Sequence, residues 1–338
     1  MLNIRKPAHP LTSPKKYNWT NLSSRELRII SQNTEIRNPT IIQKKISDQL
    51  LDVLGFYQYK GEQDFFIKII SSQDYKIQSI ADEITAYLFD AGISVNLVKN
   101  GYPRKIIELN RWIYLYPLLY YNFNAKSLNE LFLIGKEVGR MHRVMTDCPI
   151  KNDICNNGKN KNKLLRRQFK YIKLNKISPW FSQEAIELIK NFSYENYDVL
   201  EKYQQMVHGD LNFGNIIITK AQHPVIIDFE DSLVSWLNPI YDIAFVIQRF
   251  IFLNSSNVDK IQLASFFING YKSKYKIAHD KGDLYSILKM ISIRSLLILS
   301  TLDGEQATVY KSEIDKFIRL YKNTSENKLL IFKIEELF

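Results

Sequence analysis

The sequence of 338 residues predicts an α+β protein in which a β-rich front half is followed by a helical back half. Short runs of aromatic and β-branched residues, separated by Gly and Asp, fill residues 40–70 and favour antiparallel strands. Apolar residues at helical spacing dominate after residue 128, interrupted by two short apolar runs between residues 216 and 227. The change of pattern near residue 120 indicates two lobes.

The predicted elements of the front half follow in order. Residues 1–35 are rich in Pro near their start and are expected to form an N-terminal arm with one short helix at 24–33. Strands are predicted at 40–46, 53–59, 64–70, 94–98, 106–108 and 112–119, and a helix at 77–91 that ends before Gly92. Residues 36–120 are therefore expected to form one lobe, an antiparallel sheet of five or six strands that flanks one helix.

Residues 121–338 are expected to form a mainly helical lobe. Ser127, with Glu130 three residues later, predicts a capping box at the start of a helix at 128–145. The Asn- and Lys-rich segment 151–163 is expected to be a loop. Further elements are helices at 163–172, 182–197, 240–252, 259–274, 283–302 and 312–323, and short strands at 216–218 and 225–227.

Composition and charge limit the class of protein. A hydrophobic content of 45% and a charged content of 24% are ordinary for a soluble protein, and no apolar run approaches the ~18 residues that span a bilayer. The first residues lack the apolar core of a signal peptide, and Cys148 and Cys155 form neither a disulfide framework nor a metal pattern, so a cytoplasmic location is expected. The net charge of +11 reflects a bias toward Lys and Asn along the whole chain. Nucleic acid is therefore not the expected partner, and the oligomeric state is open.

The most informative segments are His208-Gly209-Asp210-Leu211-Asn212-Phe213-Gly214-Asn215 and Ile226-Ile227-Asp228-Phe229-Glu230. Two carboxylates and an amide at this spacing suit phosphoryl transfer. Asp210 can accept the proton of an attacking hydroxyl, and the oxygens of Asn215 and Asp228 can hold Mg²⁺ beside nucleotide phosphates. Short strands on either side of this segment would bring both acids to one end of a small hairpin-like unit.

This combination resembles the aminoglycoside phosphotransferase and choline kinase superfamily, the small-molecule relatives of the protein kinases. The resemblance covers residues 40–275 and implies a protein-kinase-like bilobal fold. It implies Mg²⁺-dependent transfer of phosphate from ATP to a hydroxyl of a small molecule, such as an aminoglycoside, an amino alcohol or a sugar derivative. It also implies that Lys68 grips the nucleotide phosphates and that Glu83, on the following helix, positions Lys68. His208 and Asp242 would support the catalytic loop.

The segment that would cover the phosphates departs from the pattern of this superfamily. No Gly precedes Gly55 in the turn that follows residue 46, although Gly is favoured where backbone approaches phosphate. Backbone amides around Ser47 would have to cap the phosphates instead. An alternative class therefore stays open, a catalytically weak kinase-like module that binds a protein or a nucleic acid.

The sequence leaves the acceptor open. Glu230 and Asp231 could pair with a cationic acceptor, and Trp236 could offer it an aromatic face. The carboxylate of Phe338 ends an acidic tail that resembles those of some aminoglycoside kinases. The basic segment 159–173 favours an anionic acceptor instead, through Arg166, Arg167 or Lys170.

Overall fold

The computed structural model describes residues 19–36, 41–45, 55–60, 63–120, 127–174, 181–252, 259–301 and 310–338. These residues fold as two compact units. The N-terminal unit contains the described residues of Ser13–Phe123 and Ile217–Glu230, and the C-terminal unit those of Asn124–Ile216 and Asp231–Phe338. The segment Ile226-Ile227-Asp228-Phe229-Glu230 therefore belongs to the N-terminal unit, whereas the segment from His208 to Asn215 belongs to the C-terminal unit. The predicted α+β class, with strands first and helices later, is confirmed.

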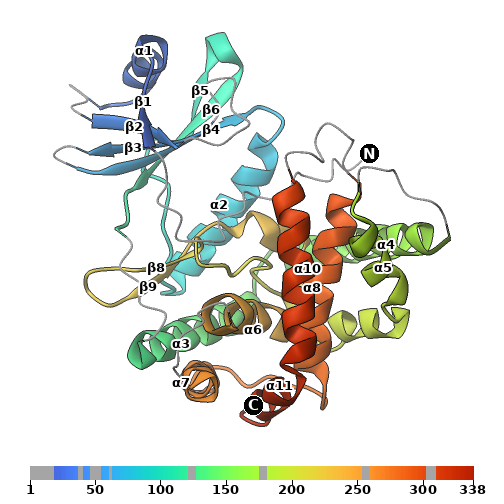
Figure 1. Cartoon of the computed structure of the whole chain (residues 1–338). Coiled ribbons are helices and arrows are strands. Elements are labelled where there is room, and N and C mark those ends of the chain that lie inside the picture. Colours follow the sequence, from blue (N-terminus) through green and yellow to red (C-terminus); the bar gives the residue numbers. More distant parts are fainter. Residues whose placement is uncertain are drawn as a thin grey trace. The chain divides into compact units, whose positions relative to one another are not determined.

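A six-stranded antiparallel sheet in the order β1-β2-β3-β4-β6-β5 forms the N-terminal unit (Figure 1). Its strands are β1 (Trp19–Asn21), β2 (Ile41–Lys45), β3 (Gly55–Lys60), β4 (Phe65–Ser71), β5 (Arg104–Ile106) and β6 (Arg111–Pro117). The strand expected at 94–98 is wrong, because Val95 makes an isolated parallel bridge to Ile226. The chain crosses β9 (Pro224–Ile226) there at one point and does not run along it.

One face of the sheet carries the apolar core of this unit. Buried residues of the strands pack there with residues of α1 (Ser24–Asn33), and they include Ile29, Ile30, Tyr57, Ile67, Ile69, Ile113 and Leu115. Helix α1 begins at a capping box, in which the Ser23 hydroxyl accepts a hydrogen bond from the Glu26 amide at 3.3 Å and the Ser23 amide donates to the Glu26 carboxylate at 2.9 Å. The alternation of a strand places Lys68 on the opposite face.

The second face of the sheet meets α2 (Tyr75–Asp90). Lys68 lies in register with Phe56 on one neighbouring strand and with Tyr114 on the other. The ring of Tyr75, at the start of α2, stacks on Trp112 of β6 with ring centroids 3.8 Å apart. The lysine is thus surrounded by aromatic residues of the sheet and by the first turns of α2.

The C-terminal unit is mainly helical, and α8 and α10 lie side by side in it (Figure 1). Its helices are α3 (Leu128–Met145), α4 (Lys151–Leu174), α5 (Gln183–Asn191), α6 (Ile240–Val246), a π-helical segment (Ile247–Phe252), α7 (Lys260–Lys272), α8 (Asp283–Leu299), α10 (Lys311–Glu326) and α11 (Lys328–Glu335). Strand β7 (Gln205–Met206) pairs with β10 (Trp236–Leu237) in this unit. Strand β8 (Ile216–Ile218) pairs with β9, and the residues of this pair from Ile217 onward belong to the N-terminal unit. None of the described helices has the length and the apolar content needed to cross a membrane.

The expected loop at 151–163 is wrong, because these residues form the first half of α4. Their polar composition hides a buried stripe at helical spacing, made of Ile154, Gly158, Asn162 and Leu165. The helix expected at 182–197 is too long, since α5 ends at Asn191 and Tyr194–Glu201 form a 3₁₀ segment. Helix α11 was not expected.

Helices α3 and α7 approach each other closely through glycines. A Cβ atom on Gly135 of α3 would lie 2.0 Å from the Phe267 carbonyl oxygen, and one on Gly270 of α7 would lie 2.1 Å from the Phe132 carbonyl oxygen. Only glycine fits at such distances, so these two residues set the spacing of the helix pair. The pair carries two of the side chains that support the candidate site.

Candidate active site

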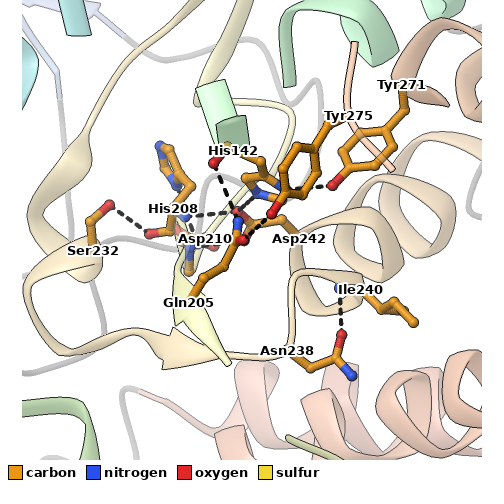
Figure 2. A network of polar contacts seen from close by, with 11 residues as sticks. His142, Gln205, His208, Asp210, Ser232, Asn238, Ile240, Asp242, Tyr271 and Tyr275 are labelled. Atoms are coloured by element: carbon orange, nitrogen blue, oxygen red, sulfur yellow. Dashed lines mark hydrogen bonds and ion pairs between the residues drawn. The ribbon is translucent and has the colours of Figure 1, made fainter. Parts of the chain in front are cut away.

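The carboxylate of Asp242 holds the backbone of the loop that begins at His208 (Figure 2). One oxygen, Oδ2, accepts a hydrogen bond from the His208 amide at 2.7 Å, and Oδ1 accepts one from the Gly209 amide at 2.9 Å. Asp242 lies in the first turn of α6 and is fully buried. Hydrogen bonds to an ionised acceptor are among the strong ones, so the carboxylate fixes the loop against α6.

A buried histidine supports Asp242 from behind. His142 of α3 places its Nε2 atom 2.9 Å from Asp242 Oδ2 and its Nδ1 atom 2.8 Å from the Tyr271 hydroxyl of α7. Because an ionised carboxylate only accepts, Nε2–H donates to it, and the tyrosine hydroxyl can donate to Nδ1. Both ring nitrogens of this buried histidine are therefore satisfied. The contact with Asp242 was not foreseen.

Gly209 is required by the space around the loop. Its φ of +87° lies in the left-handed region, and a Cβ atom there would be 2.2 Å from the Ser235 hydroxyl oxygen. The Ser232 hydroxyl donates to the His208 carbonyl at 3.1 Å, and the His208 Nδ1 atom accepts from the Asp210 amide at 3.3 Å. The histidine thus acts inside the loop, through hydrogen bonds that set the path of the backbone.

Asp210 lies among two amide side chains of the same loop. Its Oδ2 atom accepts from Asn212 Nδ2 at 2.8 Å and from Asn215 Nδ2 at 3.2 Å. The Asn215 Nδ2 atom also donates to the Asp210 carbonyl at 2.8 Å. With its nitrogen occupied, Asn215 keeps its carbonyl oxygen Oδ1, a hard ligand that suits Mg²⁺. Asn212 has a role that the sequence analysis missed, although it lies inside the motif.

In the N-terminal unit, Lys68 is bound by partners other than the expected one. Its ammonium group donates to Gln78 Oε1 of α2 at 2.6 Å and forms an ion pair with Glu230. The predicted pairing with Glu83 is wrong in this structure. Gln78 faces the sheet, whereas Glu83 is exposed, because each helical residue rotates the side chain by about 100°.

The carboxylate that α2 presents to this site is that of Asp82, one residue before Glu83. Its Oδ1 atom accepts from Gln78 Nε2 at 3.1 Å and from the Tyr116 hydroxyl at 3.3 Å. Burial raises the pKa of Asp82 to about 6, against the lowering effects of the Gln78 hydrogen bond and the charge of Lys68. Asp82 follows Gln78 by four residues, about one helical turn, so the sequence could have placed both side chains on the same face of α2.

Asp228 lies two residues after the end of β9 and two residues before Glu230. Its φ of +68° is in the left-handed region, which Asp tolerates better than most residues and which often marks a functional site. The negative charge of Asp228 contributes to raising the pKa of Tyr116, the residue that bonds Asp82. The N-terminal unit therefore brings together Lys68, Asp82, Asp228 and Glu230. Asp210 and Asn215 belong to the C-terminal unit.

The residues proposed for the acceptor have other contacts. Glu230 is the ion-pair partner of Lys68, and Asp231 Oδ1 lies 3.7 Å from Lys161 Nζ of α4. Glu230 and Asp231 could therefore bind a cationic acceptor only by losing their contacts with these lysines. Ser47, proposed near the nucleotide, lies outside the described residues.

Trp236 and Phe338 both pack against other parts of the C-terminal unit. Trp236 lies under α4, where a Cβ atom on Gly158 would be 2.6 Å from the Trp236 Cβ atom. The ring of Phe338 packs on His279, with centroids 5.5 Å apart. Both side chains are half-buried, and the first has a packing role that the sequence pattern did not show.

Of the basic side chains expected to attract an anion, Arg166 pairs with acids of the C-terminal unit. Arg166 forms ion pairs with Asp198 at 2.8 Å and Glu201 at 2.9 Å, and its guanidinium lies 4.6 Å from the ring centroid of Tyr197. Arg167 and Lys170 are exposed. Arg166 therefore connects α4 to the 3₁₀ segment that ends at Glu201.

The acidic tail holds the start of α8, which gives a test of stability. The buried carboxylate of Glu335 accepts hydrogen bonds from the Gly282 amide at 2.7 Å and the Leu284 amide at 2.8 Å. We expect Glu335→Ala to lower the free energy of unfolding by about 1–3 kcal/mol, because it leaves these donors without a partner. The matched control Glu336→Ala, at an exposed residue, should behave as wild type. Equal urea midpoints for both variants would contradict this role.

Comparison with known proteins places these units in context. Residues 114–275 match the model of the phosphotransferase enzyme family. The fold is similar to a GDP and kanamycin complex of APH(2'')-IIia, with a TM-score of 0.58 and 16% identity over 90% of this chain and 99% of that chain. A GDP complex of aminoglycoside 2'-phosphotransferase-IIIa gives a TM-score of 0.55 and 15% identity over 90% and 98% of the two chains.

The amicoumacin kinase hAmiN in complex with AMP-PNP and Ca²⁺ is similar to the same degree. It has a TM-score of 0.55 and 14% identity, over 90% of this chain and 94% of that chain. No curated protein matches the sequence. The protein-kinase-like fold implied by the sequence motif is confirmed by these structures.

Proposed function

We propose that the chain, whose residues 114–275 match the model of the phosphotransferase enzyme family, transfers the γ-phosphoryl group of ATP to a hydroxyl of a small molecule. The observation that carries this proposal is the construction of the catalytic loop. Asp210 is held by two amides of the loop, and the loop itself is held by a buried carboxylate of α6. Such rigid support is what a group needs when it must meet one proton of a bound substrate.

Each polar group has a role in this reaction. Asp210 orients the acceptor hydroxyl and receives its proton. The carbonyl oxygen of Asn215 and the carboxylate of Asp228 would hold Mg²⁺, which neutralises the charge of the transferred phosphoryl group. Lys68 binds the nucleotide phosphates, and Gln78 and Asp82 position it. The complexes of similar structures with AMP-PNP or GDP support a nucleoside triphosphate as donor.

Binding of Mg²⁺ and ATP tests the first half of the proposal. Ligand at 100 times its dissociation constant stabilises a protein by about 2.7 kcal/mol, so we expect the melting temperature to rise by several degrees. Asp228→Asn should remove most of this rise, since it removes the charge that holds the metal. Glu108→Gln, at an exposed acid of the same unit, is the matched control and should keep it.

The opposite outcome is equally informative. A wild-type protein that shows no shift with ATP and Mg²⁺, yet binds nucleic acid with a strong dependence on salt, would favour a non-catalytic binding module. A shift that Asp228→Asn retains in full would instead remove this residue from the metal site.

A further inference from the structure

The C-terminal unit contains a buried guanidinium group in which two of the three nitrogen atoms have no hydrogen-bond partner among the described residues. Arg249 is 2% exposed, and its Nε and Nη1 atoms have no hydrogen-bond partner among the described residues. The rings of Phe245 and Phe317 flank it, with the guanidinium carbon 5.8 and 5.6 Å from their centroids. An arginine buried without a carboxylate is costly, and burial accordingly lowers its pKa to about 10. Its fork of donors suits an oxyanion.

Arg249 lies beside the catalytic loop. It belongs to the π-helical segment Ile247–Phe252, a type of distortion that is frequent at functional sites. The next residue, Phe250, stacks on Phe213 of the catalytic loop with ring centroids 4.1 Å apart and an interplanar angle of 20°. The charge of Asp210 also acts on the pKa of Arg249, in the raising direction. The unsatisfied donors are therefore within electrostatic reach of the proposed catalytic carboxylate.

Two lysines from other helices are also within electrostatic reach of Asp210. Lys316 of α10 pairs with Glu313, and Lys161 of α4 lies 3.7 Å from Asp231. Burial lowers the pKa of each lysine to about 8, and the charge of Asp210 acts on both. We call Lys161, Arg249 and Lys316 the cationic cluster.

The carboxylates near the cationic cluster do not fully offset the effect of burial on it. The positive charge of Arg294, which is hydrogen-bonded to Asn162 at 2.7 Å, also lowers the pKa of Lys161. The carboxylates of Asp210, Asp231 and Glu313 act on the pKa values of the cluster, in the raising direction. For each cation of the cluster, loss of hydration disfavours the charged form more than the nearby carboxylates favour it. A polycationic acceptor would increase this deficit, whereas an anion would reduce it.

We infer that the cationic cluster binds an oxyanion, a carboxylate or a phosphate, carried by the acceptor whose hydroxyl Asp210 activates. The inference rests on the proposed function and narrows the acceptor to anionic hydroxyl compounds. Arg249 supplies the unsatisfied fork of donors, and the lysines supply charge from two further helices. The exposed basic residues of α4 are not part of this site.

Inorganic sulfate is a suitable probe, because it carries the required oxyanion and needs no nucleotide. We expect sulfate to raise the melting temperature of the wild type in a saturable manner, beyond sodium chloride at the same ionic strength. Arg249→Met should abolish this response, and Lys316→Gln should weaken the apparent affinity by roughly 10- to 100-fold. The control Lys311→Gln, at an exposed lysine of the same helix, should respond as wild type.

Arg249→Met also separates a binding role from a structural one. It replaces an unpaired buried charge with an apolar side chain between two aromatic rings, so the variant without sulfate should melt no lower than the wild type. A sulfate response that this variant retains, or a response equal to that of chloride in the wild type, would overturn the inference. If the variant does not fold, an undiminished response in Lys316→Gln overturns it.

Turnover distinguishes this inference from the proposed function. With Mg²⁺ and ATP, gluconate or glucose 6-phosphate should be phosphorylated in preference to the neutral glucose and the cationic kanamycin. Turnover of kanamycin that Arg249→Met leaves unchanged would overturn the inference and leave the phosphotransferase intact. Absence of Mg²⁺-ATP binding would instead reject the proposed function, whatever the sulfate response.

Discussion

Replacing Asp210 with Asn should lower kcat by about 10²–10⁴ while Mg²⁺-ATP remains bound. The substitution keeps the shape of the side chain, and a carbonyl oxygen can still accept from Asn212 and Asn215. It removes the basic oxygen that would receive the proton of the acceptor. Because binding of the nucleotide does not require that proton transfer, the loss should appear in the rate of the chemical step and not in the thermal shift with ATP.

Single-turnover measurements with radiolabelled ATP check this expectation directly. The control Asp153→Asn replaces an exposed acid of α4 and should turn over as wild type. Equal single-turnover rates for the wild type and Asp210→Asn would exclude Asp210 as the base. A loss of nucleotide binding in Asp210→Asn would indicate a role in holding the metal, which is distinct from the role proposed here.

The catalytic loop shows what a sequence can predict about a site. Asp210 and Asn215 lie five residues apart in one loop, so the sequence alone could place them in one site. Their hydrogen bonds within five residues of each other are local. The supporting role of Asp242 was also expected, from the family resemblance. Its partner His142 lies 100 residues away, and a contact of that range depends on how α3 packs against α6.

The partners of Lys68 show where such prediction fails. A lysine in an apolar strand requires an anionic or polar partner, but the choice among nearby candidates depends on helical phase and on the path of distant segments. Asp82 and Glu83 differ by one residue, and the rotation of about 100° between them decides which one faces the sheet. The ion pair with Glu230 spans 162 residues and forms because segment Ile217–Glu230 returns to the N-terminal unit.

The prediction of a loop at 151–163, the first half of α4, was wrong for a different reason. Asn and Lys dominate its first half, and their low hydrophobicity favours a loop when composition alone is considered. Four positions at helical spacing are buried all the same, and two of these hold Gly158 and Asn162. The glycine admits Trp236, and the asparagine accepts from Arg294, so tertiary contacts stabilise the helix. Lys161 of the cationic cluster is placed by this unexpected helix.

Asp242→Ala should have the largest effect on stability, about 3–5 kcal/mol in the free energy of unfolding. The fully buried carboxylate accepts hydrogen bonds from the amides of His208 and Gly209 and from the ring of His142. Removing it leaves three buried donors without a partner. Asp242→Asn should be damaging as well, because its NH₂ group would face one of these N–H donors.

The comparison with an exposed acid shows whether burial causes the effect. Asp280 also forms an ion pair, with Lys202 at 2.7 Å, but at the surface. Asp280→Asn should leave the unfolding midpoint in urea near that of the wild type, because water and salt screen such a pair. A similar midpoint for Asp242→Ala would show that the loop does not depend on α6. If instead stability and kcat fall together, the same buried carboxylate both stabilises the C-terminal unit and holds Asp210 in position for the reaction.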